Sequence, residues 1–126
     1  MKLLLDTHAF LWTALLRKRL SAAAIDAIEE PANDVFVSVA SVWEIEIKRA
    51  KGKLPVPDRI EEALSESRFM PLPVTLEHVL TVESLPHHHR DPFDRILIAQ
   101  AQLKGMTLVS SDREFRRYPV AVLPAS

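Results

Sequence analysis

Cysteine is absent from this sequence of 126 residues. Disulfide frameworks and thiolate metal sites are therefore excluded, and any bound metal must use oxygen or nitrogen ligands. No hydrophobic run is long enough to cross a membrane or to act as a signal peptide, because the opening run Leu3-Leu4-Leu5 stops at Asp6. We therefore expect a cytoplasmic protein that makes no contact with membranes.

The chain also has few glycines and a small net charge. The chain has only two glycines and no low-complexity tract, while 48% of its residues are hydrophobic and 26% are charged. This balance is typical of a compact globular chain, and its length predicts a single domain spanning residues 1–126. The formal net charge of −1 gives no general attraction to nucleic acid, which nucleic-acid binders commonly obtain from a basic excess.

Strands and helices are expected to alternate along the chain. The apolar patterns predict strands at 2–5, 35–37, 107–109 and 120–123, a connection or short edge strand at 71–73, helices at 9–16, 21–30, 39–50, 55–68, 75–83 and 92–104, and a helical turn after Asp112. The expected strands are continuously apolar rather than alternating, so both of their faces should be buried. The sequence therefore predicts an α/β three-layer sandwich, with a central parallel sheet of four to five short strands flanked by helices.

Four acidic residues fall where expected strands and helices meet. Asp6 ends the first strand, and Glu44 lies in the first turns of the third helix. Asp94 opens the last long helix, and Asp112 directly follows the strand after it. Helices in such units run antiparallel to the strands, so all four positions should meet at the edge of the sheet where α/β folds bind ligands.

Each acid also has a purely structural interpretation. Asp6 and Asp112 could cap the helices that follow them. The segment Asp91-Pro92-Phe93-Asp94 has the pattern of a capped helix start. Glu44 could form a capping box with Ser41 or pair with Lys48 one turn later.

The acids taken together indicate more than capping. Four carboxylates brought to one edge without a cation would repel one another and raise one another's pKa. Carboxylate and water oxygens are the ligands that Mg²⁺ and Mn²⁺ prefer. The sequence therefore predicts a site for Mg²⁺ or Mn²⁺ formed by Asp6, Glu44, Asp94 and Asp112.

Short basic clusters accompany the acids. They are Arg17-Lys18-Arg19, Lys48-Arg49 with Lys51 and Lys53, and Arg113 with Arg116-Arg117. Such clusters can neutralise phosphates around an acidic centre, or they can form an ordinary solvated face. Arg95 lies beside Asp94 and could clamp a phosphate or pair with a neighbouring carboxylate.

Four segments carry recognisable motifs in order. They are Leu3-Leu4-Leu5-Asp6-Thr7-His8, Ser38-Val39-Ala40-Ser41-Val42-Trp43-Glu44-Ile45, His89-Arg90-Asp91-Pro92-Phe93-Asp94-Arg95 followed by Ile98-Ala99-Gln100-Ala101, and Leu108-Val109-Ser110-Ser111-Asp112. Together they resemble the motifs of the PIN-domain nucleases, in particular the VapC-type toxins of bacterial and archaeal toxin–antitoxin pairs. The resemblance covers nearly the whole chain.

The resemblance implies an endoribonuclease that hydrolyses RNA phosphodiesters with metal-activated water. Its implied metal ligands and catalytic residues are Asp6, Glu44, Asp94 and Asp112, with Asp91 as an outer contributor and Thr7 and Ser110 as hydrogen bonders behind the ligands. Among the basic residues, Lys48, Arg49 and Arg95 are the candidate RNA contacts. It further implies a homodimer, and a cognate antitoxin whose C-terminal segment covers the active-site groove.

Other side chains invite a function but have simpler interpretations. His87-His88-His89 is interpreted as a solvated or RNA-facing loop rather than a metal site. A structural hydrogen bond is the expected role of His8. Trp12, Trp43, Phe10 and Phe93 could stack on bases, but packing in the core or in a dimer is the preferred interpretation for most of them.

Three rival functions stay open. A catalytically silent PIN-like binding module would keep the fold and act only through protein or RNA contacts. An aspartate-nucleophile phosphatase would begin with the same strand and Asp, but it needs a second acid two residues later as general acid, where this chain has His8. A phosphorylated receiver domain normally has two adjacent acids at its first strand, and Asp6 stands alone.

Overall fold

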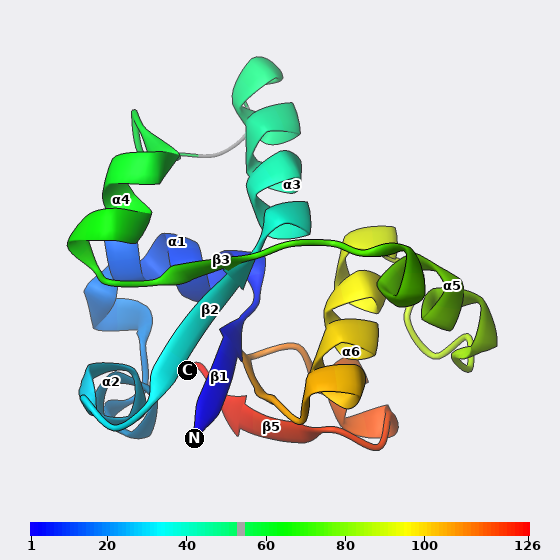
Figure 1. Cartoon of the computed structure of the whole chain (residues 1–126). Helices are drawn as coiled ribbons and strands as arrows, with labels where there is room; N and C mark the ends of the chain where they lie inside the picture. Colours follow the sequence, from blue (N-terminus) through cyan, green and yellow to red (C-terminus); the bar gives the residue numbers. More distant parts are fainter. Residues whose placement is uncertain (53–54) are drawn as a thin grey trace.

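A computed structural model describes residues 1–52 and 55–126, and these residues form a parallel sheet between two layers of helices (Figure 1). The strands are β1 (Lys2–Leu5), β2 (Asp34–Ser38), β3 (Met70–Leu72), β4 (Thr107–Ser110) and β5 (Ala121–Pro124). They lie in the order β3-β2-β1-β4-β5, and every neighbouring pair is parallel. The predicted α/β sandwich is confirmed. Pro71 lies in the edge strand β3, where a missing N–H is tolerated.

The helices begin and end close to the predicted residues. They are α1 (Thr7–Leu15), α2 (Ala22–Glu29), α3 (Val39–Ala50), α4 (Ile60–Glu66), α5 (Leu76–Ser84) and α6 (Pro92–Lys104), with 3₁₀ turns η1 (Arg17–Arg19) and η2 (Arg113–Arg117). Helix α1 begins two residues earlier than predicted because Asp6 caps it. Helix α4 begins later than the predicted 55, because Pro55 and Pro57 keep the chain extended before it.

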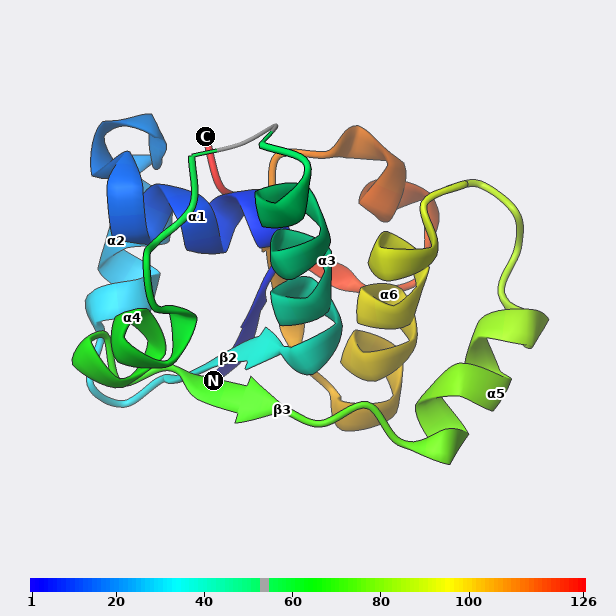
Figure 2. The ribbon, with the colours of Figure 1, turned by 90° about the horizontal axis from the view of Figure 1, so that it is seen from above.

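Two apolar cores lie on opposite faces of the sheet. Leu3 and Leu5 of β1 point into the core that contains Phe10, whereas Leu4 points into the core that contains Phe115. Figure 2 shows α1, α2 and α4 on one side of the sheet and α5 and α6 on the other. The continuously apolar strand is therefore explained by burial on both faces.

Helix α3 lies between the two helical layers at the carboxyl ends of the strands (Figure 2). It follows β2 without a loop, and the Ser38 side chain caps it by accepting a hydrogen bond of 3.1 Å from the Ala40 N–H. Because all five described strands point the same way, the residues that follow β1, β2 and β4 meet at this edge. In the described part of the chain, no helix is long and apolar enough to span a membrane.

Candidate metal centre

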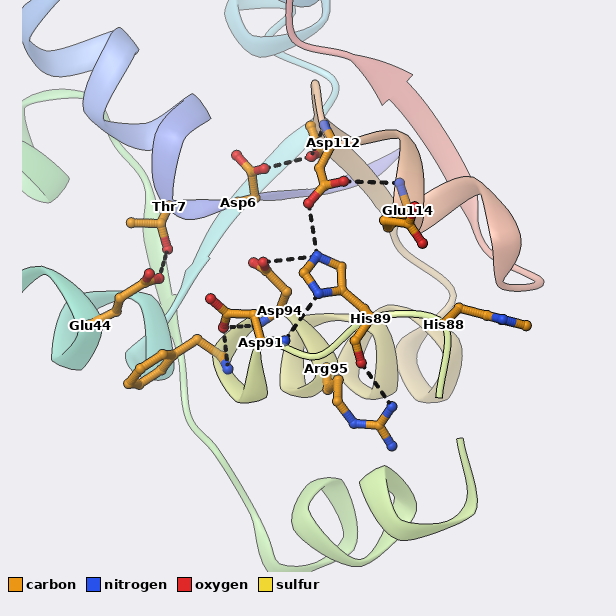
Figure 3. Close-up of polar contacts among 12 residues, drawn as sticks. Asp6, Thr7, Glu44, His88, His89, Asp91, Asp94, Arg95, Asp112 and Glu114 are labelled. Carbon is orange, nitrogen blue, oxygen red and sulfur yellow. Dashed lines mark hydrogen bonds and ion pairs between the residues drawn. The ribbon is translucent and has the colours of Figure 1, made fainter. Parts of the chain in front are cut away.

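The four predicted acids meet around one cavity of about 400 Å³ at the carboxyl edge of the sheet (Figure 3). The cavity is lined by Asp6, Thr7, His8, Trp12, Arg19, Glu44, Lys48, Asp91, Asp94, Ser111 and Asp112. The acids come from the ends of β1 and β4 and from helices α3 and α6. The arrangement that the sequence predicted for them is therefore present.

Asp6 has both of the roles considered for it. One carboxylate oxygen accepts a hydrogen bond of 2.8 Å from the Ala9 N–H and so caps α1. The other accepts a hydrogen bond of 2.5 Å from the Ser110 hydroxyl, which reaches across from β4. Burial raises the pKa of Asp6, and the Ser110 hydrogen bond opposes this shift by favouring the charged form.

Glu44 is buried and has a partner on each oxygen. The Thr7 hydroxyl donates to Oε1 at 2.6 Å, and Lys48 Nζ lies 2.8 Å from Oε2. Thr7 and Ser110 thus make the hydrogen bonds behind the acids that the sequence suggested. The capping box between Ser41 and Glu44 does not form, because α3 begins at Val39 and Ser38 caps it.

Asp94 has a strongly perturbed carboxyl group. Asp91 caps α6 by accepting hydrogen bonds from the N–H groups of Phe93 and Asp94 at 2.8 and 3.2 Å. The Asp94 side chain is 20% exposed. Burial raises its pKa to about 8, and the nearby charges of Asp91, Asp6, Glu44 and Asp112 add to the shift. Without a metal, the charge repulsion at Asp94 is thus not fully neutralised, and an all-oxygen donor set of this kind suits a hard divalent cation.

His89 is a member of the site that the sequence interpretation missed. Its ring Nε2 lies 3.1 Å from Asp94 Oδ2 and 2.8 Å from Asp112 Oδ2, and its side chain is 11% exposed. Figure 3 shows His88 directed away from the acids, and His87 is exposed. The expectation of a solvated loop is therefore wrong for His89. Its position two residues before the Asp91 cap was the available signal, since a loop that enters a helix there can fold back over its first turn.

Arg95 does not have the predicted role. Its guanidinium is buried and donates to the carbonyl oxygens of Pro86, Val82 and Leu85 at 3.0, 2.8 and 3.3 Å. Figure 3 shows it directed away from the acids, toward α5. One residue along a helix is a rotation of about 100°, so the neighbour of Asp94 faces a different layer. The predicted RNA contact at Arg95, and the alternative of a carboxylate partner, are both wrong.

Of the other two candidate RNA contacts, one faces the acidic cavity and one does not. Lys48 lines the cavity, but Arg49 does not. The Arg49 guanidinium donates to the Pro57 carbonyl oxygen at 2.6 Å and pairs with Glu46. The structure therefore does not support the predicted contact at Arg49, whereas Arg19 of the first basic cluster does line the cavity. Lys53 lies outside the described residues.

Comparison with known proteins agrees with this geometry. The family model described as the PIN domain matches residues 3–121. Ribonuclease VapC22 of Mycobacterium tuberculosis (strain ATCC 25618 / H37Rv) is 32% identical over 120 residues, which cover 91% of this chain and 90% of that protein.

Solved structures share the fold at low sequence identity. The VapBC2 complex of Rickettsia felis, bound to a DNA fragment from its promoter, matches with a TM-score of 0.73 and 14% identity over 100% of both chains. DNA-bound VapBC of Salmonella typhimurium matches with a TM-score of 0.65 and 18% identity, over 98% of this chain and 97% of that one. With the family model and the 32% identical relative, these findings show that the chain belongs to the PIN-domain family and is of the VapC type.

Proposed function

We propose that this chain is a divalent-metal-dependent endoribonuclease and the toxin of a type II toxin–antitoxin pair. The observation that carries the proposal is the convergence of Asp6, Glu44, Asp94 and Asp112 on one cavity in a chain of this family. The name of its relative, a ribonuclease, supports RNA as the substrate. Metal-dependent cleavage of RNA by the purified chain tests the proposal.

The four acids would hold Mg²⁺ or Mn²⁺. When bound, the cation supplies Lewis-acid activation of water and neutralises charge on the phosphate. The chain's own residues place the ligands: Ser110 orients Asp6, and Thr7 orients Glu44. Because Asp6 is fixed by two hydrogen bonds at the end of a buried strand, it is organised before any ligand arrives.

The rival phosphatase mechanism needs an acidic residue two positions after Asp6 as its general acid, and the chain has none there. His8 occupies the second position after Asp6, and its ring packs beside Trp12 at a centroid distance of 6.3 Å. The silent binding module is a more serious rival, because it would share the fold. It predicts no cation-dependent cleavage, so the same assay separates it from the nuclease.

Arg19 and Lys48 are the basic residues that line the cavity, and we propose that they contact RNA phosphates. Lys48 also pairs with Glu44, so Arg19 gives the cleaner test. We expect Arg19→Ala to weaken RNA binding and to reduce the slope of log affinity against log salt by about 1, because one phosphate contact is lost.

Lys18→Ala is the matched control, since Lys18 is the exposed neighbour of Arg19 but does not line the cavity. Binding measured by fluorescence anisotropy over a salt series, with a cleavage-deficient background, gives both slopes. Equal slopes for Arg19→Ala and wild type would remove Arg19 from the RNA surface.

We propose that the chain forms a homodimer through an apolar groove next to the acidic cavity. The groove measures about 530 Å³ and is lined by Val39, Ala40, Trp43, Val74, Val79, Pro92, Phe93 and Ile96. Trp43 is 64% exposed and packs edge-on against Phe93 at 5.4 Å. Leu76 and Leu80 project from α5 beside it, exposed by 74% and 62%. A two-fold interface pairs the same self-complementary patch of both subunits, and an exposed apolar patch of this kind is suited to that burial.

We expect Trp43→Glu to convert a dimer into a monomer, because the charge would be buried in an apolar interface. Light scattering after size-exclusion chromatography measures the mass directly. Leu15→Glu is the control, since Leu15 is an exposed leucine at the end of α1. A wild-type chain that is monomeric at concentrations well above micromolar would contradict the proposal and leave the groove to a different protein.

An antitoxin partner is the last part of the proposal. Two of the solved structures with this fold are of complexes named VapBC, from two organisms. We propose a cognate antitoxin whose C-terminal segment covers the acidic cavity and suppresses cleavage. Purified chain that cleaves RNA equally well with and without its antitoxin would contradict this part alone.

A further inference from the structure

The side chains of the acids in the cluster differ in the number of hydrogen bonds that hold them. Asp6 accepts from Ala9 and Ser110, and Glu44 accepts from Thr7 and Lys48. Asp94 is different. Of the residues that the structure describes, only His89 contacts the Asp94 carboxylate within hydrogen-bond or ion-pair distance.

His89 is also shared between two acids from distant segments. Asp112 Oδ1 accepts a hydrogen bond of 2.9 Å from the Glu114 N–H, and Asp112 Oδ2 lies 2.8 Å from His89 Nε2. The same Nε2 lies 3.1 Å from Asp94 Oδ2. One ring nitrogen thus connects the first turn of α6 to the segment after β4 (Figure 3).

The tautomer of His89 follows from its other ring nitrogen. The Asp91 N–H donates to Nδ1 at 3.2 Å, so Nδ1 must present a lone pair. The ring proton is then on Nε2, where it is donated to Asp112 Oδ2, and Asp94 Oδ2 lies 3.1 Å from the same nitrogen. A ring that donates through Nε2 has no lone pair there for a cation, so the geometry gives His89 the role of a donor and not of a ligand.

We propose that His89 is a positioning residue of the metal centre, whose Nε2–H donates to Asp112 while the ring lies against Asp94, so that it fixes the two carboxylates relative to each other for a bound cation. This inference rests on the proposed metal-dependent function. The inference adds one residue to the four acids of the family's motifs. This residue, His89, lies in the loop before α6.

The test compares three variants by cation affinity. His89→Leu removes the donor while keeping an apolar side chain against Phe115, whose ring lies 5.5 Å from that of His89. His89→Gln restores an N–H donor at about the position of Nε2. His87→Leu is the matched control, because His87 is an exposed residue of the same loop. Calorimetric titration with Mg²⁺ and separately with Mn²⁺ gives the dissociation constants.

We expect His89→Leu to weaken the binding of both cations by about 10- to 100-fold, the usual cost of losing an outer partner. His89→Gln should recover most of this loss, and His87→Leu should bind as wild type does. Long-range ¹H–¹⁵N spectra of the metal-free protein at pH 8 should show the Nε2–H tautomer.

Several results would overturn the inference. Unchanged affinity in His89→Leu, tighter binding in that variant, or an Nδ1–H tautomer would each do so. A much larger loss for Mn²⁺ than for Mg²⁺ would make His89 a nitrogen ligand instead, since Mn²⁺, a transition-metal ion, accepts an imidazole nitrogen more readily than the harder Mg²⁺ does. Wild-type protein that binds neither cation would instead refute the proposed metal centre itself, and the inference with it.

Discussion

Asp94→Asn should abolish RNA cleavage and at the same time make the metal-free protein more stable at alkaline pH. Losing a ligand should cost more than the ~10- to 100-fold that loss of an outer partner costs. The gain in stability comes from removing a carboxyl group whose charged form is disfavoured by burial and by the acids around it. Asn keeps the size of the side chain and an oxygen that can accept from His89.

The pH dependence of this gain has a definite sign. Burial and the neighbouring acids raise the pKa of Asp94 from 3.8 to about 8 in the folded protein, so folding favours the protonated carboxyl group. Its contribution to stability is fully present below the unfolded value of 3.8 and is lost as the pH rises through about 8. The variant and the wild type should therefore be equally stable near pH 4 and differ most near pH 9.

Melting curves of both proteins in chelator over that pH range measure the effect. The other ionisable groups facing Asp94 are Asp91, Asp6, Glu44, Asp112 and His89, and they are present in both proteins. Their titration is therefore shared to a first approximation. We expect a difference of about 1–3 kcal/mol at pH 9, or roughly 5 °C or more in melting temperature.

Asp26→Asn is the matched control, because Asp26 is an exposed acid on α2. It should leave both cleavage and the pH profile unchanged. If Asp94→Asn cleaves RNA at the wild-type rate, Asp94 is not part of the active centre. If its stability falls in parallel with that of wild type between pH 4 and 9, the charge repulsion described here is absent.

Divalent cations should stabilise the wild-type protein strongly. A ligand that binds only the folded state adds about 2.7 kcal/mol at a concentration one hundred times its dissociation constant, which is roughly 10 °C in melting temperature for a domain of this size. The physical reason is that Mg²⁺ or Mn²⁺ replaces the repulsion among the four acids with attraction.

The stabilisation of the wild-type protein by divalent cations should be compared with that of the variant Asp6→Asn. Asn caps a helix about as well as Asp, so α1 should be unaffected, while one charged ligand is removed. Melting curves with MgCl₂ or MnCl₂, and with NaCl at matched ionic strength, separate specific binding from screening. Stabilisation that is equal in NaCl, or equal in Asp6→Asn, would contradict a cation site at Asp6.

Much of this site could be predicted from local sequence. Leu3-Leu4-Leu5 followed by Asp6 predicts a buried strand that ends at an acid, and the structure confirms this because β1 is buried on both faces. The pattern Asp91-Pro92 predicts the start of α6, which places Asp94 in its first turn. Parallel strands and returning helices then bring these acids to one edge by topology alone.

The roles of Arg95 and His89 could not be predicted in this way, because they depend on tertiary contacts. The residue beside Asp94 turns about 100° around the helix and meets carbonyl oxygens of the segment that connects α5 to α6. Spacing along the chain does not reveal which layer lies there. His89 reaches Asp112 only because its loop folds back over α6, and no local pattern brings together residues that lie 23 positions apart.

Cleavage of a mixed RNA pool by the purified protein should be measured with Mg²⁺ or Mn²⁺, with chelator, and with Asp94→Asn alongside. We expect the wild-type protein to cleave RNA only when the cation is present, and the variant to cleave it under no condition. Cleavage that persists in chelator or in Asp94→Asn would contradict a metal-dependent mechanism at these acids. Absence of cleavage by the wild-type chain with either cation would favour the binding module in its place.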